Sequence, residues 1–173
     1  MPLMLYLMVG YPGSGKTTTA RLLAEATGAV HLSSDALRLE LFPHPTFTED
    51  EHQAVYTELN QRTEQLLKNG ASVVYDANLN RRLHRTEKYE LAAQAGARPV
   101  VIWMQTPLDL SKTRAVIRGH SHLVPRDETF ESMFDRVART IEPPAPNEPV
   151  YKLDGKHVTA ASVKTLLAHI QPL

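Results

Sequence analysis

The stretch that decides the fold runs Gly10-Tyr11-Pro12-Gly13-Ser14-Gly15-Lys16-Thr17. It matches the pattern G-x-x-x-x-G-K-[ST] at every fixed position, and it lies between an apolar run and a helical pattern, as that pattern requires. Its glycines allow backbone conformations that other residues avoid and a close approach to an anion. Successive amide N–H groups of such a loop point inward at phosphate oxygens. The stretch therefore predicts a loop that binds the phosphates of a nucleoside triphosphate at the start of a helix.

The side chains of this loop have separate expected roles. Lys16 is expected to act in catalysis by reaching the β- and γ-phosphates of ATP, and the Thr17 hydroxyl is expected to ligate Mg²⁺. Thr18 and Thr19 are expected as helix positions close to the nucleotide rather than as metal ligands. The predicted nucleotide-binding residues of this segment are Gly10, Pro12, Gly13, Ser14, Gly15, Lys16, Thr17 and Thr18.

Apolar runs alternate with helical patterns along the rest of the chain. Strands are predicted at residues 3–9, 29–32, 72–75, 99–104 and 150–153. Helices are predicted at residues 17–27, 35–41, 49–69, 81–95, 107–118, 127–141 and 162–170. Thr48 and Glu51 have the spacing of a capping box at the start of the third helix. The alternation predicts one α/β domain over residues 1–173, with a parallel sheet covered by helices on both faces.

Composition is that of a globular protein, with 173 residues, 42% hydrophobic and 22% charged. No apolar run approaches the roughly 20 residues that cross a bilayer, and the first residues lack the positive start of a signal peptide, so a cytoplasmic location is expected. The absence of cysteine excludes disulfides and thiol catalysis. Because 19 basic residues balance 19 acidic ones, an extensive nucleic-acid footprint is not expected.

Asp35 and Arg38 follow the second predicted strand. Ligands of open α/β sheets bind beyond the carboxyl ends of the strands, so Asp35 is expected on the same edge as the glycine-rich loop. Its carboxylate could accept the proton of an acceptor hydroxyl, and Arg38, one turn later, could bind a phosphate or carboxylate of the acceptor. The alternative is that Asp35 caps a short helix and that Arg38 is a surface residue.

Asp76 ends the third predicted strand, Val73-Val74-Tyr75-Asp76, which has the form of a Walker B element. Asp76 is expected to hold Mg²⁺ through water, or to fix Arg38 or Thr17. Asn78 follows on the same edge and is a candidate for binding the acceptor. The alternative for both residues is a role as turn formers.

Arg114 and Arg118 lie four residues apart on one predicted helix, followed by a loop at residues 119–125. A lid over about residues 114–130 is expected to deliver Arg118 to the charge that develops on the transferred phosphoryl group. The alternative is a pair of solvated arginines. His120 and His122 lack matched partner ligands, so a metal site is not expected there.

Five segments together resemble a known family: the glycine-rich loop, Ser34-Asp35-x-x-Arg38, Asp76-Ala77-Asn78-Leu79-Asn80, Arg114-x-x-x-Arg118 and Val124-Pro125. They are similar to the P-loop kinase module of phage-type polynucleotide kinase and its small bacterial relatives, over about residues 3–140. The resemblance implies an adenylate-kinase-like three-layer sandwich with strand order 2-3-1-4-5. It also implies that Asp35 is the general base, that Arg38 contacts the acceptor's phosphate, that Arg118 is the lid arginine and that Arg114 lies beside the nucleotide.

The chain departs from that family in one respect. The segment Lys152-Leu153-Asp154-Gly155-Lys156 lacks the first Asp and the Thr of the phosphatase motif, so phosphatase activity is not expected. The same kinase module occurs in zeta-toxin-like and other small-molecule kinases. The expected function is therefore that of an ATP-dependent kinase acting on a hydroxyl. The preferred candidate for the acceptor is the 5′-hydroxyl of a nucleic acid or nucleotide. The alternatives are a small-molecule kinase for a sugar, sugar nucleotide or antibiotic, and a nucleotide-binding module with little turnover. The oligomeric state stays open.

Overall fold

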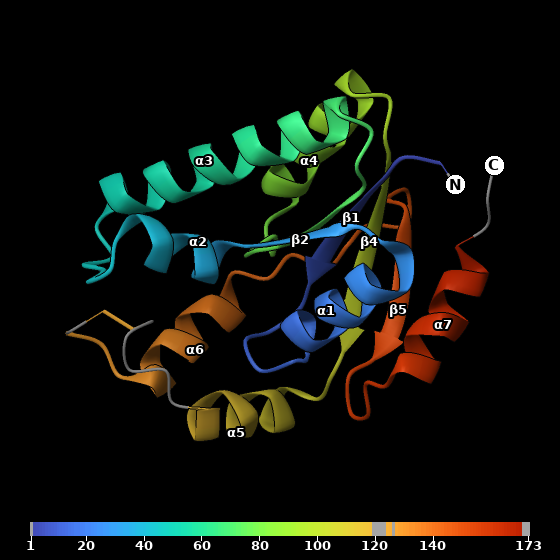
Figure 1. Ribbon diagram of the computed structural model, residues 1–173. Helices are drawn as coiled ribbons and strands as arrows, with labels where there is room; N and C mark the ends of the chain where they lie inside the picture. Colours follow the sequence, from blue (N-terminus) through green and yellow to red (C-terminus); the bar gives the residue numbers. More distant parts are fainter. Residues whose placement is uncertain (1, 119–123, 126, 171–173) are drawn as a thin grey trace.

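A computed structural model describes residues 2–118, 124–125 and 127–170 (Figure 1). These residues form a five-stranded parallel sheet in the order β2-β3-β1-β4-β5, which confirms the predicted order. The strands are β1 (Met4–Val9), β2 (Val30–Ser33), β3 (Val73–Asp76), β4 (Arg98–Gln105) and β5 (Val150–Asp154).

Helices cover both faces of this sheet, so the predicted three-layer sandwich is confirmed. The helices are α1 (Lys16–Thr27), α2 (Ser34–Leu41), α3 (Glu49–Lys68), α4 (Arg82–Gln94), α5 (Leu108–Arg118), α6 (Phe130–Arg139) and α7 (Ala160–His169). Helices α1 and α7 pack on one face, and α2, α3 and α4 pack on the other. Helices α5 and α6 lie together beyond the carboxyl ends of the strands (Figure 1).

The central strand β1 is buried along its whole length, as its apolar run predicted. Its side chains alternate between the two cores: Tyr6 and Met8 face α1 and α7, whereas Leu5 and Leu7 face α3 and α4. Because β1 is held from both faces, the loop that follows it starts from a rigid position.

Most helices begin within two residues of their predicted starts, but one start and one cap differ more. The helix predicted from residue 127 begins at Phe130, because Thr129 is its N-cap and forms a reciprocal capping box with Ser132. At α3 the predicted capping box is only half formed. The Thr48 hydroxyl accepts the Glu51 N–H at 3.3 Å, but the Glu51 carboxylate accepts the backbone N–H groups of Thr46 and Phe47 instead.

The proline-rich connector between α6 and β5 has no regular structure, as predicted, yet it is firmly attached. Its Glu148 accepts hydrogen bonds from Arg85 Nε at 2.7 Å and Nη2 at 3.0 Å, and from the Tyr89 hydroxyl at 2.5 Å. Both members of the Arg85–Glu148 ion pair are buried. In the described part of the chain, no helix is both long and apolar enough to cross a membrane.

Candidate active site

The glycine-rich loop connects β1 to α1 and has the backbone of an anion-binding loop. Gly10, Gly13 and Gly15 all have positive φ angles, of 154°, 76° and 98°. A Cβ at Gly13 would lie 2.2 Å from the Ser111 carbonyl oxygen on α5, so no larger residue fits there. Gly15 is the N-cap of α1 and carries no side-chain cap, and the first turn of α1 holds no acidic residue. The first amides of α1 therefore remain open to phosphate oxygens.

Lys16 folds back over this loop, where its Nζ donates hydrogen bonds to the carbonyl oxygens of Gly10 at 2.9 Å and Tyr11 at 2.8 Å. Burial lowers the pKa of Lys16 to about 8. The negative charges of Asp76 and Asp35 oppose that shift, and the positive charge of Arg118 adds to it. The structure thus brings Asp35, Asp76 and Arg118, from three separate elements, within electrostatic reach of Lys16.

Asp35 lies in the first turn of α2, at the carboxyl end of β2. The N-cap of this helix is Ser33, whose hydroxyl accepts the Ala36 N–H at 3.3 Å. The alternative that Asp35 caps the helix is therefore wrong. The Asp35 side chain is exposed at the same sheet edge as Lys16 and is close enough to affect the pKa of Lys16.

Arg38 is buried, with 6% of its surface exposed, so the surface-residue alternative is wrong. Its Nη1 lies 3.5 Å from Glu51 Oε2, and its Nη2 lies 3.4 Å from His52 Nδ1. The guanidinium also lies over the Phe47 ring, 5.1 Å from its centroid. Phe47 has a left-handed backbone with φ of 58°, and its N–H donates to Glu51 at 2.7 Å. Glu51 thus fixes both Arg38 and the loop that covers it.

Asp76 and Asn78, at the end of β3, make different kinds of contact: Asp76 contacts a neighbouring strand, and Asn78 forms a local turn. Asp76 is buried and its Oδ2 lies 3.0 Å from His31 Nε2, so among the described residues it contacts His31 rather than Arg38 or Thr17. The Asn78 side chain accepts the Asn80 N–H at 3.2 Å. This bond two residues along the chain is that of a turn former, and a role of Asn78 toward the acceptor stays a prediction.

Arg114 ties α5 to the loop after β5. Its guanidinium donates to the carbonyl oxygens of Gly155 at 2.6 Å and Lys156 at 2.7 Å. Gly155 in turn lies against the glycine-rich loop, because a Cβ there would be 2.4 Å from the Ser14 carbonyl oxygen and 1.8 Å from Thr106 Oγ1. The Thr106 hydroxyl donates to that same Ser14 oxygen at 2.7 Å. Arg114 is thus a structural neighbour of the loop rather than a solvated arginine.

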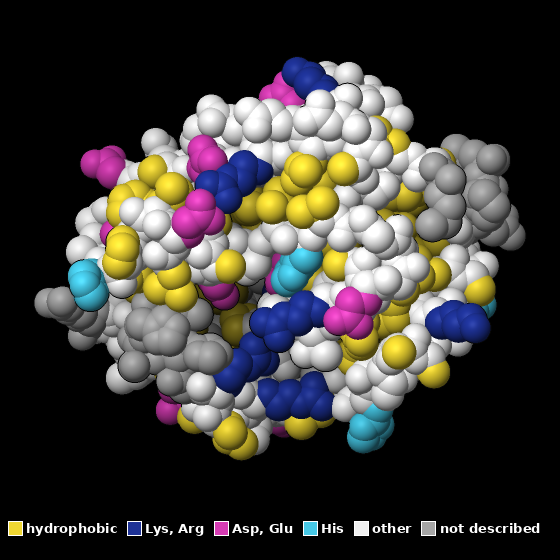
Figure 2. Space-filling view, in the orientation of Figure 1, with side chains coloured by type: hydrophobic (Ala, Val, Ile, Leu, Met, Phe, Trp, Pro, Cys, Tyr) yellow, Lys and Arg dark blue, Asp and Glu magenta, His cyan; other side chains and the backbone are white. Residues whose placement is uncertain are grey.

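Arg118 is the last residue of α5 and is exposed. The predicted lid includes residues 119–123 and 126, which lie outside the described residues, as do His120 and His122. Figure 2 shows a hollow near the centre of this face, with a margin of Lys and Arg side chains on one side. Such a margin suits an anionic ligand.

A family model described as AAA domain matches residues 5–144. The chain belongs to this AAA domain family. No curated protein matches the chain, but solved structures share its fold. A putative kinase from Chloroflexus aurantiacus has a TM-score of 0.78 at 20% identity, with 99% of this chain and 100% of that chain covered.

Two further solved structures share the fold. The APS kinase of Mycobacterium tuberculosis, in complex with AMPPNP and APS, has a TM-score of 0.70 at 18% identity, with 98% of this chain and 99% of that chain covered. A chain of the Pnkp1/Rnl/Hen1 RNA repair complex has a TM-score of 0.66 at 20% identity, with 80% of this chain and 44% of that chain covered. At such identities these likenesses show that the AAA domain has the fold of P-loop kinases.

The residues of this AAA domain fit a triphosphate and Mg²⁺. The open amides of α1 and the Lys16 ammonium suit phosphate oxygens. The Thr17 hydroxyl and the Asp76 carboxylate are oxygen ligands of the kind that Mg²⁺ takes. No group of three or more His, Cys, Asp or Glu side chains that could hold a metal occurs within residues 2–118, 124–125 and 127–170. An Mg²⁺ ion here would therefore take most of its ligands from phosphates and water.

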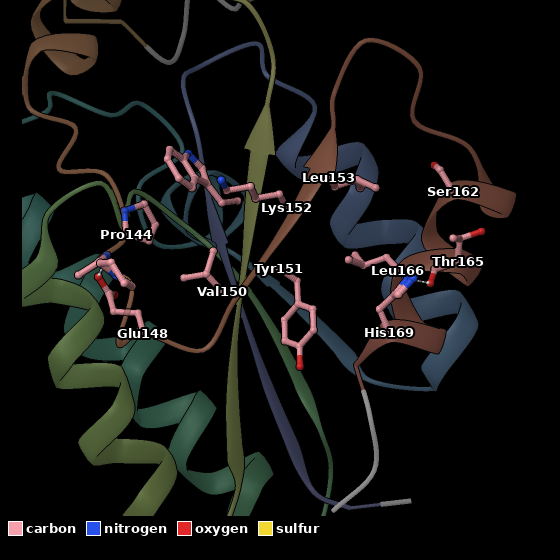
Figure 3. A pocket seen from close by; sticks show the side chains of 13 residues that line it. Pro144, Glu148, Val150, Tyr151, Lys152, Leu153, Ser162, Thr165, Leu166 and His169 are labelled. Carbon is pink, nitrogen blue, oxygen red and sulfur yellow. Dashed lines mark hydrogen bonds between the residues drawn. The ribbon is translucent and has the colours of Figure 1, made fainter.

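Of two hollows in the described part of the chain, one borders this site and the second does not. One, of about 590 Å³, borders the glycine-rich loop at Gly10 and Tyr11 and extends to Trp103 and Pro143. The other, of about 900 Å³, lies along edge strand β5 (Figure 3). There the side chains of β5 and α7 line it together with the connector, and none of the predicted site residues does. The larger volume therefore does not identify the candidate site. The charged residues around Lys16 identify it instead.

Sequence reasoning missed two residues of this site. His31, on β2, contacts Asp76, and the Tyr56 hydroxyl accepts the Asn78 N–H at 3.2 Å. His31 lies in a short predicted strand, for which the sequence indicated only pairing with a neighbouring strand. Tyr56 follows the helical period of α3 like a core residue. Both depend on contacts between distant segments, for which the sequence carries no local signal.

Proposed function

We propose that this AAA domain is an ATP-dependent kinase that transfers the γ-phosphate of ATP to a hydroxyl group. The observation that carries the proposal is the set of charges around Lys16, where Asp35 and Asp76 are close enough to raise its pKa and Arg118 is close enough to lower it. A phosphate-binding loop alone supports only nucleotide binding. A carboxylate and an arginine from other elements beside it are the further parts that phosphoryl transfer uses.

The chemistry follows from these positions. The loop amides and Lys16 bind the β- and γ-phosphates, and bound Mg²⁺ would supply charge neutralisation at those oxygens. Asp35 accepts the proton of the acceptor hydroxyl as its oxygen forms a bond to the γ-phosphorus. The bond from that phosphorus to the β–γ bridging oxygen breaks, and ADP leaves with the electron pair. Arg118 stabilises the negative charge of the transferring group.

The acceptor is proposed to carry an anionic group near its reactive hydroxyl. Arg38 supports this, because it is one helical turn from Asp35 and its hydrogen bonds to Glu51 and His52 are both long. A guanidinium held in that way can donate hydrogen bonds to a phosphate or carboxylate of the acceptor. The first candidate is a nucleotide or nucleic acid with a free 5′-hydroxyl. The second is a small anionic molecule such as a sugar acid, which the zero net charge of the chain favours.

A panel assay tests the proposal. ADP release is measured with ATP, Mg²⁺ and one acceptor at a time: a 5′-hydroxyl oligonucleotide, a nucleoside 3′-phosphate and gluconate. Acceptor-dependent release by the wild type, absent in Lys16→Ala, is expected for one class. If ATP binds but no acceptor raises ADP release above the rate without acceptor, the protein is a nucleotide-binding module and the proposal is wrong.

A further inference from the structure

Tyr56 joins three segments of the candidate site. It lies on α3 beside the core residue Val55, and its ring packs against His52 with the centroids 4.5 Å apart. Its hydroxyl accepts the backbone N–H of Asn78 at 3.2 Å, in the turn that follows β3. The same hydroxyl shares a hydrogen bond with the side chain of Ser34, the first residue of α2. One phenol oxygen therefore connects α3, the start of α2 and the turn after β3.

Asp35 follows Ser34 directly in the chain, so this connection reaches the residue next to the proposed base. Strand β2 is an edge strand of the sheet and pairs only with β3. Its side chains are exposed or half-buried, and Asp35 itself is exposed. The Ser33 cap fixes the helix to its own strand, and Ser33 pairs with Asp76 at the end of β3. The turn at Asn78 lies two residues beyond that pair, and the Tyr56 hydroxyl adds a contact between this turn and Ser34.

The phenol stays in its neutral form under working conditions. Burial raises the pKa of Tyr56, the negative charge of Asp35 raises it further, and Arg38 lowers it. A neutral phenol keeps its O–H, so it can donate one hydrogen bond while accepting the Asn78 N–H. Because it does not ionise, it cannot replace Asp35 as the acceptor of a proton.

We propose that Tyr56 is a positioning residue for phosphoryl transfer: its hydroxyl, by linking Ser34 to the Asn78 turn, sets the place of Asp35 relative to the glycine-rich loop. The inference rests on the proposed kinase function. A displacement of about 1 Å at a reacting group can reduce the rate a hundredfold, so loss of this link is expected to reduce turnover. Nucleotide affinity is expected to persist, since Tyr56 contacts His52, Asn78 and Ser34, which lie outside the glycine-rich loop.

The test compares Tyr56→Phe with Tyr89→Phe. Both variants remove one hydrogen-bonded phenol oxygen and keep the ring, but the Tyr89 hydroxyl bonds to Glu148 in the connector. Kinetics are measured with ATP and the acceptor that gives the highest ADP release among the 5′-hydroxyl oligonucleotide, nucleoside 3′-phosphate and gluconate. Ser34→Ala, which removes the other end of the link, is measured in parallel.

Tyr56→Phe is expected to lower kcat roughly tenfold, with KM for ATP and for the acceptor within about twofold of wild type and Tm within about 2 °C. Ser34→Ala is expected to change kcat in the same direction, and Tyr89→Phe to leave it unchanged. Unchanged kcat in Tyr56→Phe would overturn the inference, as would a rise in acceptor KM alone, which would make Tyr56 a binding contact. Equal losses in Tyr56→Phe and Tyr89→Phe would overturn it as well. These outcomes leave the kinase function standing, whereas a wild type that binds ATP without transfer refutes both.

Discussion

Arg114 on α5 is bonded to Gly155 after β5 by a 2.6 Å hydrogen bond from its guanidinium to the backbone carbonyl. The two residues come from opposite sides of the glycine-rich loop, since Gly155 abuts Ser14 and α5 abuts Gly13. This bond joins the helix that ends in Arg118 to the loop after β5, which contacts the glycine-rich loop. These contacts hold the proposed donor side of the site, whereas Asp35, Arg38 and Tyr56 lie on its proposed acceptor side.

Replacing Arg114 should weaken nucleotide binding. Arg114→Ala removes the bonds to Gly155 and Lys156, and we expect ATP affinity to fall roughly tenfold, the loss of one or two charge-assisted hydrogen bonds. Titration with a fluorescent ATP analogue measures this. The matched control is Arg139→Ala, an exposed arginine in the last turn of α6. Equal affinity in Arg114→Ala and wild type would show that the brace has no role in binding.

Gly155→Ala should disturb the same junction from the other side. The added Cβ would meet Thr106 Oγ1 at 1.8 Å and the Ser14 carbonyl at 2.4 Å, so the glycine-rich loop must shift. We expect about 1–3 kcal/mol of lost stability from overpacking, measured by urea unfolding, together with weaker ATP binding. Gly96→Ala is the comparison for ATP affinity, because its added Cβ meets no atom within 4 Å. Its φ of 68° makes that variant lose stability through backbone strain, so only its ATP affinity is expected to equal that of the wild type. ATP affinity unaffected by Gly155→Ala would contradict this account of the junction.

Nucleotide binding should take up a proton at alkaline pH. The pKa of Lys16 is about 8 in the free protein, so the ammonium is partly deprotonated above that pH. Phosphate oxygens favour the charged form and raise the pKa. We expect uptake close to zero at pH 6.5 and a large fraction of a proton at pH 8.5, from calorimetry in buffers of different ionisation enthalpy. Uptake that is equal at the two pH values would argue against this environment for Lys16.

The buried pair Arg85–Glu148 should stabilise the fold at neutral pH. Burial alone would raise the pKa of Glu148, but hydrogen bonds from Arg85 and Tyr89 hold it at about 2. Glu148→Gln leaves Arg85 buried without a countercharge, and we expect a loss of about 3 kcal/mol in the free energy of unfolding at pH 7. Glu40→Gln, which breaks an exposed arginine pair, should change it little.

The pH dependence gives a second check on that pair. A carboxyl whose pKa is lowered by folding contributes its stability above the unfolded value of 4.5, and that contribution is lost as pH falls toward 2. The difference between wild type and Glu148→Gln should therefore be full above pH 5 and shrink between pH 4.5 and 2. A difference that stays constant over this window would contradict the assigned pKa.

Much of the fold could be predicted from local patterns. The unbroken apolar run before the glycine-rich loop identified the central strand, and glycines and prolines marked most helix ends. Errors arose where two local signals competed. Thr48 and Glu51 have capping-box spacing, but Glu51 instead bonds the N–H groups of Thr46 and Phe47. Nothing in the spacing shows that this loop folds over Arg38.

Local sequence patterns likewise predicted some residues of the candidate site and missed others. Lys16 and Thr17 belong to a continuous motif. The expected roles of Asp35 and Arg38 rested on their place after the second predicted strand, which left alternatives open, and on a family resemblance. Tyr56 contacts Asn78, 22 residues further along the chain, and such contacts form only when α3 packs on the sheet. Residues of this kind follow the helical period like core positions, so periodicity could not separate them.

The most direct test of the central claim is phosphoryl transfer by Asp35→Asn. Transfer from γ-labelled ATP to the preferred acceptor is measured in single-turnover reactions, with ATP affinity measured on the same samples. We predict that the variant binds ATP as wild type does and transfers roughly 100-fold or more slowly, the usual contribution of a general base. Transfer at the wild-type rate by Asp35→Asn would contradict the assignment of Asp35 as the base and, with it, the proposed transfer site.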